Sequence, residues 1–462
     1  AATGEPLTSA GMANNVTFTV PLNKNTASSV LFKKFIVAVK SGGAYVPVSE
    51  GHYITNPECG ATLAGTRRSG AKKGMILDAV KIHDNAERHD LGVTQGAYNI
   101  FLDDIVNTNG ANTVAYSFNG STYYFNANKL AEYDDAYSTF YRDGIDMTVI
   151  ILTRKKAGSE YLWHPLARDG GEGACPYGML NCAEKQGADT IAAALSFLAE
   201  RYGDGANGYG QIDNWVIGNE VNVRGTYNYI TPMDVATYSK IYADGFRIAY
   251  NAIKSQNANA RVCTNIDQVW NLKTSYAHTY NGKDFLDYFA ASINAEGNVN
   301  WSLTQHPYNV PLTQAAFWNN NAFYKSLVTH KVTTQYLTME NIEVLTDYMM
   351  NASMLNPEGQ VRDILLTECG YSSLKEGEAA QAAALIYSYQ RVANNQYIDL
   401  ILYNRQTDDT TEIAQGMAMG MTNQDGSHKQ VYDYYKYMDT ENASPYIAAA
   451  KAAIGNWNMY AR

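Results

Sequence analysis

The 462-residue sequence lacks several features that would place it in a familiar class of protein. It has no run of Lys and Arg and its net charge is −10, so the basic patch that a nucleic-acid partner needs is missing. No apolar run approaches the ~20 residues of a membrane-spanning helix, so we expect no membrane span. With 17% charged and 46% hydrophobic residues, the composition is that of a folded chain with a large core.

Motifs of several enzyme classes are also missing. There is no His-Glu-x-x-His pair, no Asp-rich calcium loop and no cysteine cluster, so the sequence predicts no metal site. There is no phosphate-binding loop and no dinucleotide-binding glycine pattern, so it predicts no cofactor. Serine-hydrolase motifs are absent too.

Cysteines are few, at five in the whole chain. Cys175 and Cys182 lie close together in a glycine-rich loop and could pair if the protein is exported, so the sequence leaves their disulfide state open. The first residues, Ala1 to Gly4, are compatible with the start of a chain whose signal peptide has been removed. We therefore expect a secreted or cell-surface protein of the bacterial type, although cysteine usage alone does not decide the compartment. The sequence leaves the oligomeric state open.

Tyrosine is abundant, with 36 residues. Aromatic rings with a polar tip suit sugar binding, but tyrosine can equally take the place of phenylalanine in packing. Both interpretations remain open for most of these residues.

The first 70 residues differ in pattern from the rest. Short strands are expected at Val16–Val20, Ser29–Val39 and Ala44–Val48, joined by turns rich in Asn, Ser and Gly. We expect residues 1–70 to form a small β-rich extension and residues 71–462 to form the main domain.

In the main domain, apolar strands alternate with helical segments. The expected strands are Gly74–Leu77, Ala97–Leu102, Asp146–Leu152, Asn214–Gly218, Arg261–Ile266, Ser302–Gln305, Asp363–Thr367 and Asp399–Tyr403. The expected helices include Ile191–Tyr202, Met233–Lys254 capped by Thr231-Pro232, Ala379–Ala393, and one that begins at Tyr432. Thr113–Asn126 is expected to form a hairpin that turns at Asn119-Gly120. Eight such strands favour an α/β fold of the (β/α)8 TIM-barrel type.

Two glutamates end predicted strands four and seven. Glu220 follows Asn219 after an apolar strand, and Glu368 ends a second apolar strand. The carboxyl ends of barrel strands surround the active site, and glycosidic bond cleavage needs two facing carboxyl groups. This pattern resembles clan A of the glycoside hydrolases, a group of retaining (β/α)8-barrel glycosidases, over roughly residues 72–450.

The resemblance implies roles for the two glutamates. Glu220 would be the catalytic acid/base and Glu368 the nucleophile of a retaining glycoside hydrolase that acts on a poly- or oligosaccharide. Tyr308, in the Gln305-His306-Pro307-Tyr308 segment, would donate a hydrogen bond to Glu368. A non-catalytic carbohydrate-binding barrel and a transglycosylase remain as alternatives. Strand two lacks the arginine that is common in the clan, and strand eight lacks the tryptophan that is usual there. These departures indicate a remote family within the clan, so the resemblance does not identify the sugar.

Further substrate contacts are expected from polar and aromatic residues near the strand ends. Besides Asn219, His306 and Tyr308, the candidates are Asn99, Arg405, Trp163, His164 and Trp270. The loop from Lys155 to Gly187 follows strand three and is long enough to wall a substrate cleft. The two catalytic carboxyl groups should lie about 5 to 5.5 Å apart, as retention requires, with a proton held on Glu220 and an ionised Glu368.

Overall fold

Parallel strands close into an eight-membered barrel in the computed structural model, which describes residues 6–106, 111–169, 175–274 and 276–460. Position two of the barrel is shared by two short strands, β4 and β5, that pair with the same neighbour. In barrel order the strands are β3 (Lys73–Ile76), β4 (Gln95–Ala97) with β5 (Ile100–Phe101), β8 (Asp146–Leu152), β9 (Asn214–Ile217), β10 (Arg261–Ile266), β11 (Ser302–Gln305), β12 (Ile364–Cys369) and β13 (Ile398–Tyr403). The predicted TIM barrel is confirmed.

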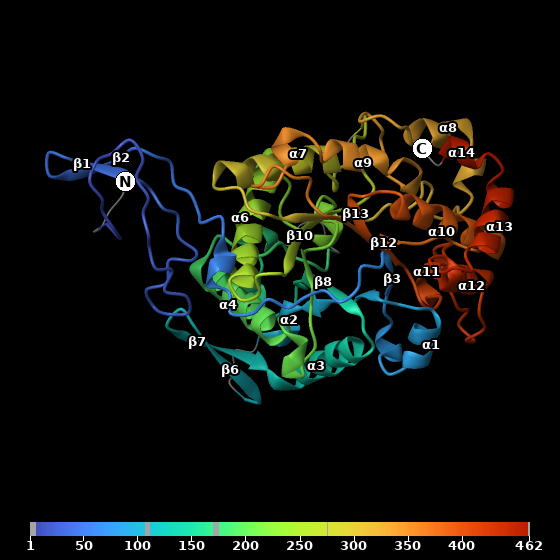
Figure 1. Cartoon of the computed structure of the whole chain (residues 1–462), viewed down its shortest axis with the longest axis horizontal. Helices are drawn as coiled ribbons and strands as arrows, with labels where there is room; N and C mark the ends of the chain where they lie inside the picture. The colour runs from blue at the N-terminus through green and yellow to red at the C-terminus, as the bar shows by residue number, and fades with distance from the viewer. Residues whose placement is uncertain (1–5, 107–110, 170–174, 275, 461–462) are drawn as a thin grey trace.

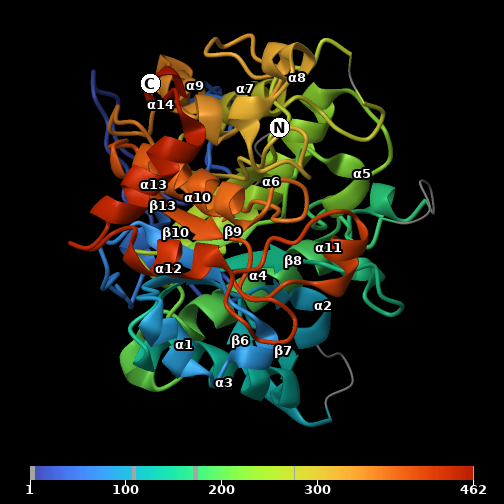
Figure 2. The same cartoon turned by 90° about the vertical axis from the view of Figure 1, so that its right-hand side faces the viewer.

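Helices cover the outside of this barrel (Figures 1 and 2). They are α1 (Asn85–Asp90), α2 (Leu102–Ile105), α3 (Ala127–Arg142), α4 (Lys185–Arg201), α5 (Arg224–Tyr227), α6 (Val235–Lys254), α7 (Gly282–Ala295), α8 (Ala322–Leu327), α9 (Glu343–Tyr348), α10 (Glu378–Ala393), α11 (Thr410–Ala414), α12 (Gln430–Tyr437), α13 (Ser444–Ile454) and α14 (Trp457–Tyr460). No helix among the described residues is long and apolar enough to span a membrane.

Apolar sequence explains the central strands. All seven residues of β8 are buried, as expected for a parallel strand covered on both faces. Strand two departs from the prediction, because β4 stops at Ala97 and β5 runs only from Ile100 to Phe101 before α2 begins.

The start of α6 also differs from the prediction. Its N-cap is Asp234, whose side chain accepts a hydrogen bond from the Thr237 N–H, rather than Thr231 before Pro232. A carboxylate satisfies the free N–H groups of the first turn, so the N-cap lies three residues after Thr231 and the helix begins two residues after Met233.

The predicted hairpin forms as β6 (Thr113–Phe118) and β7 (Ser121–Asn126), with Asn119 and Gly120 at the turn. Phe118 packs with Ala192 and Ala193 of α4, outside the barrel. The hairpin therefore lies against the outer helix layer.

The N-terminal extension contains less strand than predicted. Its only described sheet is the pair β1 (Ala38–Ser41) and β2 (Ala44–Pro47), which projects from one side of the molecule in Figure 1. Val16–Val20 forms no strand, and Ser29–Val39 is mostly irregular. Val16 and Phe18 remain 39% and 43% exposed. Apolar, strand-favouring residues without a neighbouring strand gain no ladder hydrogen bonds, which explains the difference.

The extension covers the amino-terminal end of the barrel. Lys24 Nζ donates to the carbonyls of Gly60 and Ser255, 2.7 and 2.8 Å away, where α6 has just ended. The backbone N–H of Ser69 donates to buried Asp146 at the start of β8, at 2.8 Å. These contacts leave the carboxyl end of the barrel as the open end.

Candidate active site

The barrel interior changes from apolar to polar toward its carboxyl end. One buried cluster holds Ala97, Leu365, Leu400 and Leu402, and a second holds Ile150, Leu152, Val216 and Cys263. At or just after the carboxyl ends of the strands the residues are polar instead, at Asp78, Asn99, Arg154, Glu220, Asp267, Glu368 and Asn404. The mouth of the barrel is therefore a ring of polar groups.

Glu220 is held in an uncommon backbone conformation at the end of β9. Its φ is +38°, in the left-handed region that non-glycine residues seldom adopt, and Gly218, two residues before it, has φ +84°. The Glu220 N–H donates to the Asn265 Oδ1 atom. Backbone strain of this kind persists where surrounding contacts fix it, and it is concentrated at functional sites.

Glu368 faces Glu220 from β12 and is fixed by a short chain of hydrogen bonds. The Tyr308 hydroxyl donates to Glu368 Oε2 at 3.1 Å, and Asn404 Nδ2 donates to the Tyr308 oxygen at 2.8 Å. The hydrogen bond expected from the sequence is thus present. Both glutamates remain reachable, since their side chains are 15% (Glu220) and 22% (Glu368) exposed.

His306 connects the two carboxyl groups from a fully buried position. Its Nδ1 lies 2.8 Å from Glu220 Oε1 and 3.7 Å from Glu368 Oε2. Its Nε2 lies 3.1 Å from Asn265 Nδ2. Because Asn265 Oδ1 already accepts from Glu220 N–H, the Asn265 amide nitrogen is the donor to Nε2. His306 Nδ1 therefore carries the hydrogen and donates it to Glu220.

The charges at the site are strongly coupled. The pKa of Glu368 is raised overall, mainly by burial and also by the charge of Glu220. His306 and the Tyr308 hydrogen bond lower this pKa, but by less. The sequence predicts an easily ionised Glu368, and the structure differs because burial beside a second carboxyl group outweighs the hydrogen bond. Burial lowers the pKa of His306, but the charges of Glu368 and Glu220 outweigh burial, so the pKa of His306 is raised overall.

Asp267 adds a third carboxyl group to this cluster. It is buried after β10, accepts from Asn222 Nδ2 at 2.7 Å and from the Val269 N–H at 2.8 Å. Burial, followed by the charge of Glu220, raises the pKa of Asp267 to about 8. It therefore holds its proton near neutral pH and adds no negative charge there.

Three possible ligand atoms of Glu220, His306 and Glu368 lie within 4.8 Å of one another. Two carboxylates and an imidazole are the kinds of group that bind a divalent cation, although the sequence has no metal-binding motif at these positions. The tautomer inferred above fits this poorly, because a metal-binding nitrogen must be free of hydrogen and His306 Nδ1 donates its hydrogen to Glu220. The same distance places one oxygen of each glutamate close together.

A family described only as a family of unknown function, DUF5722, matches residues 66–460. The chain belongs to the DUF5722 family. No curated protein matches it.

Solved structures resemble this DUF5722 chain at low sequence identity. A family 39 glycoside hydrolase from Bacteroides cellulosilyticus WH2 is 14% identical, with a TM-score of 0.52 over 86% of this chain and 67% of that one. A hyperthermophilic β-glucosidase from Pyrococcus furiosus is 15% identical, with a TM-score of 0.52 over 83% and 88%. GH5_18 from Bifidobacterium longum subsp. longum is 10% identical, with a TM-score of 0.50 over 80% and 78%. These likenesses confirm the fold that the clan A resemblance implied.

Three residues predicted to contact substrate are structural in this DUF5722 chain. Trp163 is 8% exposed and its indole N–H donates to the Arg154 carbonyl at 3.0 Å, so it anchors its own loop. His164 is 6% exposed and its Nδ1 accepts from the Leu166 N–H. Trp270 is fully buried and donates to the Val332 carbonyl. None of the three offers an open ring face to a sugar.

The polar candidates lie at the barrel mouth. Asn219 is buried, and its Oδ1 has no hydrogen-bond partner among the described residues. Arg405 lies 3.4 to 3.6 Å from carboxylate oxygens of Asp78, Asp409 and Glu412. Asn99 lines a cavity over the ends of strands one to three. Their contact with substrate stays a prediction.

Sequence reasoning missed residues that loops bring to the site. Tyr227 of α5 is close enough to Glu220 and Glu368 that, after burial, their charges raise its pKa. Its ring stacks on Tyr177 with centroids 6.1 Å apart. Tyr177 lies in the described part of the loop after β8, so this loop reaches the carboxyl end as predicted. The only sequence signal for this pair was the general abundance of tyrosine.

Cys175 and Cys182, which the sequence left as a possible pair, do not pair in the structure. Cys175 and Cys182 are both free thiols. Cys175 Sγ donates to the Thr226 carbonyl at 3.0 Å, whereas Cys182 faces the Ile241 carbonyl on α6. The two thiols are directed at different parts of the fold, which closeness in sequence did not reveal.

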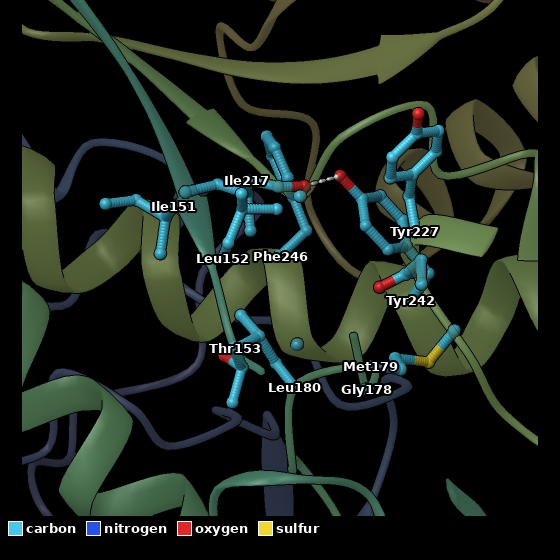
Figure 3. A pocket seen from close by; sticks show the side chains of 13 residues that line it. Ile151, Leu152, Thr153, Gly178, Met179, Leu180, Ile217, Tyr227, Tyr242 and Phe246 are labelled. Atoms are coloured by element: carbon cyan, nitrogen blue, oxygen red, sulfur yellow. Dashed lines mark hydrogen bonds between the residues drawn. The ribbon is translucent and has the colours of Figure 1, made fainter. Parts of the chain in front are cut away.

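A small void lies in the wall beside the site (Figure 3). It measures about 10 Å³ and is lined by residues of β8, β9 and α6, including Ile151, Ile217 and Phe246. The Tyr242 hydroxyl closes one side by donating to the Ile217 carbonyl at 2.6 Å. A space of this size holds about one water molecule, so it is no substrate site.

Proposed function

We propose that the protein is a retaining glycoside hydrolase in which Glu220 is the acid/base and Glu368 the nucleophile. The observation that carries the proposal is the arrangement of the two carboxyl groups. They lie at the mouth of a TIM barrel, on strands four and seven, with one oxygen of each within 4.8 Å of the other. Retaining enzymes have carboxyl groups about 5 to 5.5 Å apart, whereas inverting enzymes leave about 6.5 to 9.5 Å for a water molecule.

The first step joins the sugar to Glu368. The Glu368 carboxylate forms a bond to the anomeric carbon while the bond from that carbon to the leaving oxygen breaks. Glu220 gives its proton to the leaving oxygen. The Tyr308 hydroxyl holds the attacking carboxylate in place through its hydrogen bond to Glu368 Oε2.

The second step releases the sugar. Glu220, now ionised, takes a proton from water, whose oxygen attacks the anomeric carbon and displaces Glu368. His306 Nδ1–H stabilises the ionised form of Glu220 between the two steps. The cycle requires Glu220 to be protonated and Glu368 to be ionised when it begins.

The alternatives differ in what they require. A binding barrel needs neither the coupled carboxyl pair nor the strained backbone of Glu220. A transglycosylase would use the same two residues with a sugar in place of water. Product analysis separates hydrolysis from transfer.

The test is hydrolysis of a panel of 4-nitrophenyl α- and β-glycosides by the protein and by Glu220→Gln and Glu368→Gln variants. We expect at least one glycoside to be cleaved with retention, read by NMR of the first-formed anomer, and each variant to lose about 100-fold or more in rate. Asp213→Asn is a matched control, since Asp213 is a buried carboxyl group at the opposite end of the barrel.

Two outcomes would contradict the proposal. One is inversion of the anomer, and the other is equal activity of the two glutamate variants and the protein itself. Activity that a chelator abolishes would instead favour a metal held by Glu220, His306 and Glu368.

A further inference from the structure

A second cavity of about 400 Å³ lies at the carboxyl end of the barrel, over strands one to three. It is lined by Ile76, Leu77, Ala79, Ala97, Tyr98, Asn99, Phe101, Asp104, Lys129, Glu132, Tyr133 and Arg154. Neither Glu220 nor Glu368 lines it. Its volume falls within the ~300 to 1,000 Å³ of ligand pockets.

The floor of this cavity belongs to the barrel interior. Ile76 and Ala97 pack with Leu400 and Leu402, and Phe101 packs against the cluster of Ile150 and Leu152. These apolar residues lie directly beneath the polar ring that carries the two glutamates. The cavity therefore opens on the same end of the barrel as the proposed catalytic centre.

The charges around the cavity are paired. Arg154 lies 2.8 Å from Asp103 Oδ2 and also pairs with Asp104, while Lys129 pairs with Glu132. Every charged side chain that lines the cavity thus has an opposite charge beside it among the described residues. An anionic or cationic ligand would find no uncompensated charge, and placing one there would disrupt existing pairs.

The remaining chemistry suits a neutral polyhydroxylated ring. Asn99, Asp104 and Lys129 provide donors and acceptors, while the partly exposed rings of Tyr98 and Phe101, the latter beneath the Arg154 guanidinium, provide apolar surface. Sugar rings present hydroxyl groups at their edge and C–H groups on their faces, so they need both kinds of surface together.

We propose that this cavity is a binding subsite for an uncharged sugar unit that is not the one cleaved by Glu220 and Glu368. The substrate would then be a neutral oligo- or polysaccharide rather than a simple glycoside. This inference rests on the proposed function for its role in catalysis, whereas sugar binding in the cavity can be measured without it.

The variant that tests the cavity is Ala79→Trp. Ala79 is exposed and lines the cavity, so a large side chain there fills the space without removing a core contact. Val80→Trp is the matched control, because Val80 is 93% exposed and does not line the cavity. Lys129→Ala provides a second, independent change at a polar position of the lining.

Binding is measured by calorimetry on the Glu368→Gln protein with β-1,4-linked gluco-, manno- and xylo-oligosaccharides of one to five units, and with trigalacturonate as an anionic probe. We expect one neutral series to bind at least tenfold more tightly at three units or more than at one. Adding Ala79→Trp or Lys129→Ala should remove that gain, and adding Val80→Trp should keep it. Tighter binding of trigalacturonate, no binding of any neutral probe, or a gain unaffected by Ala79→Trp would overturn the inference.

Kinetics distinguish this inference from the proposed function. If kcat/KM rises with chain length in the protein and the rise is lost in Ala79→Trp, both hold. If glycosides are cleaved but chain length and Ala79→Trp have no effect, the subsite is wrong and the hydrolase stands. If neutral oligosaccharides bind in an Ala79-dependent way and nothing is cleaved, the hydrolase is wrong and the subsite stands.

Discussion

At the scale of single residues, the site depends on hydrogen bonds that position and stabilise its charged groups. His306 donates to Glu220, Tyr308 donates to Glu368, and Asn265 fixes the ring orientation of His306. Glu220 and Glu368 are identifiable from the sequence because each ends an apolar strand. Asn265 and Asp267 are harder to identify, since polar residues near a strand end are common and their partners come from other strands.

The first prediction concerns Tyr308. Its hydrogen bond lowers the pKa of Glu368, so Tyr308→Phe should raise that pKa further. The nucleophile must be ionised, so activity is lost as pH falls through this pKa, and the acid limb of the kcat/KM profile should move to higher pH by about one unit. Tyr242→Phe, which loses a buried hydroxyl in the wall shown in Figure 3, should leave the limb in place. Identical shifts in the two variants would contradict the assignment.

The second prediction concerns Asp267, whose pKa rises to about 8 from an ordinary value of 3.8. Its protonated form stabilises the fold, so the contribution is complete below pH 3.8 and is lost as pH rises toward 8. Asp267→Asn keeps an acceptor for Asn222 and Val269 and cannot ionise. The Tm of the variant relative to the unsubstituted protein should therefore increase from pH 5 to pH 8.5. A constant difference in Tm across this range would argue against a protonated Asp267.

At the scale of elements, the apolar strands are the part that sequence predicts best. β8, β10 and β11 have the bounds expected from their apolar runs. The extension was predicted poorly, since Val16–Val20 has strand-like residues but no partner strand in the described fold. The sequence placed Trp163 and Trp270 in the correct loops, yet the direction of each ring depends on carbonyls that only the folded chain brings near.

The cap of α6 provides an element-scale prediction. Asp234 accepts from the Thr237 N–H and hydroxyl, so Asp234→Ala should lower the free energy of unfolding by more than the loss of an ion pair elsewhere on the helix does. Asp244→Ala on the same helix removes only a partly exposed pair with Lys240, and should cost about 0.5 kcal/mol or less. Urea denaturation of both variants measures the difference. Equal effects would show that the cap contributes no more than the ion pair.

At the scale of the whole molecule, the two ends of the barrel differ in structure. The extension and the segment around Ser69 close the amino-terminal end, where Asp146 is fully buried. The carboxyl end carries the polar ring and the 400 Å³ cavity. Strand order alone predicts that Glu220 and Glu368 face each other. The cavity and the Tyr177–Tyr227 pair could not be predicted, because loops from several strands meet there.

Chemical rescue of Glu220→Ala tests the central claim most directly. If Glu220 is the acid/base, this variant should lose far more activity on glycosides with poor leaving groups than on activated aryl glycosides, which need little protonation. Azide should partly restore the rate on an aryl glycoside and give a glycosyl azide of retained configuration, because Glu368 still forms the covalent intermediate. Equal loss on all leaving groups, with no effect of azide, would contradict the role assigned to Glu220.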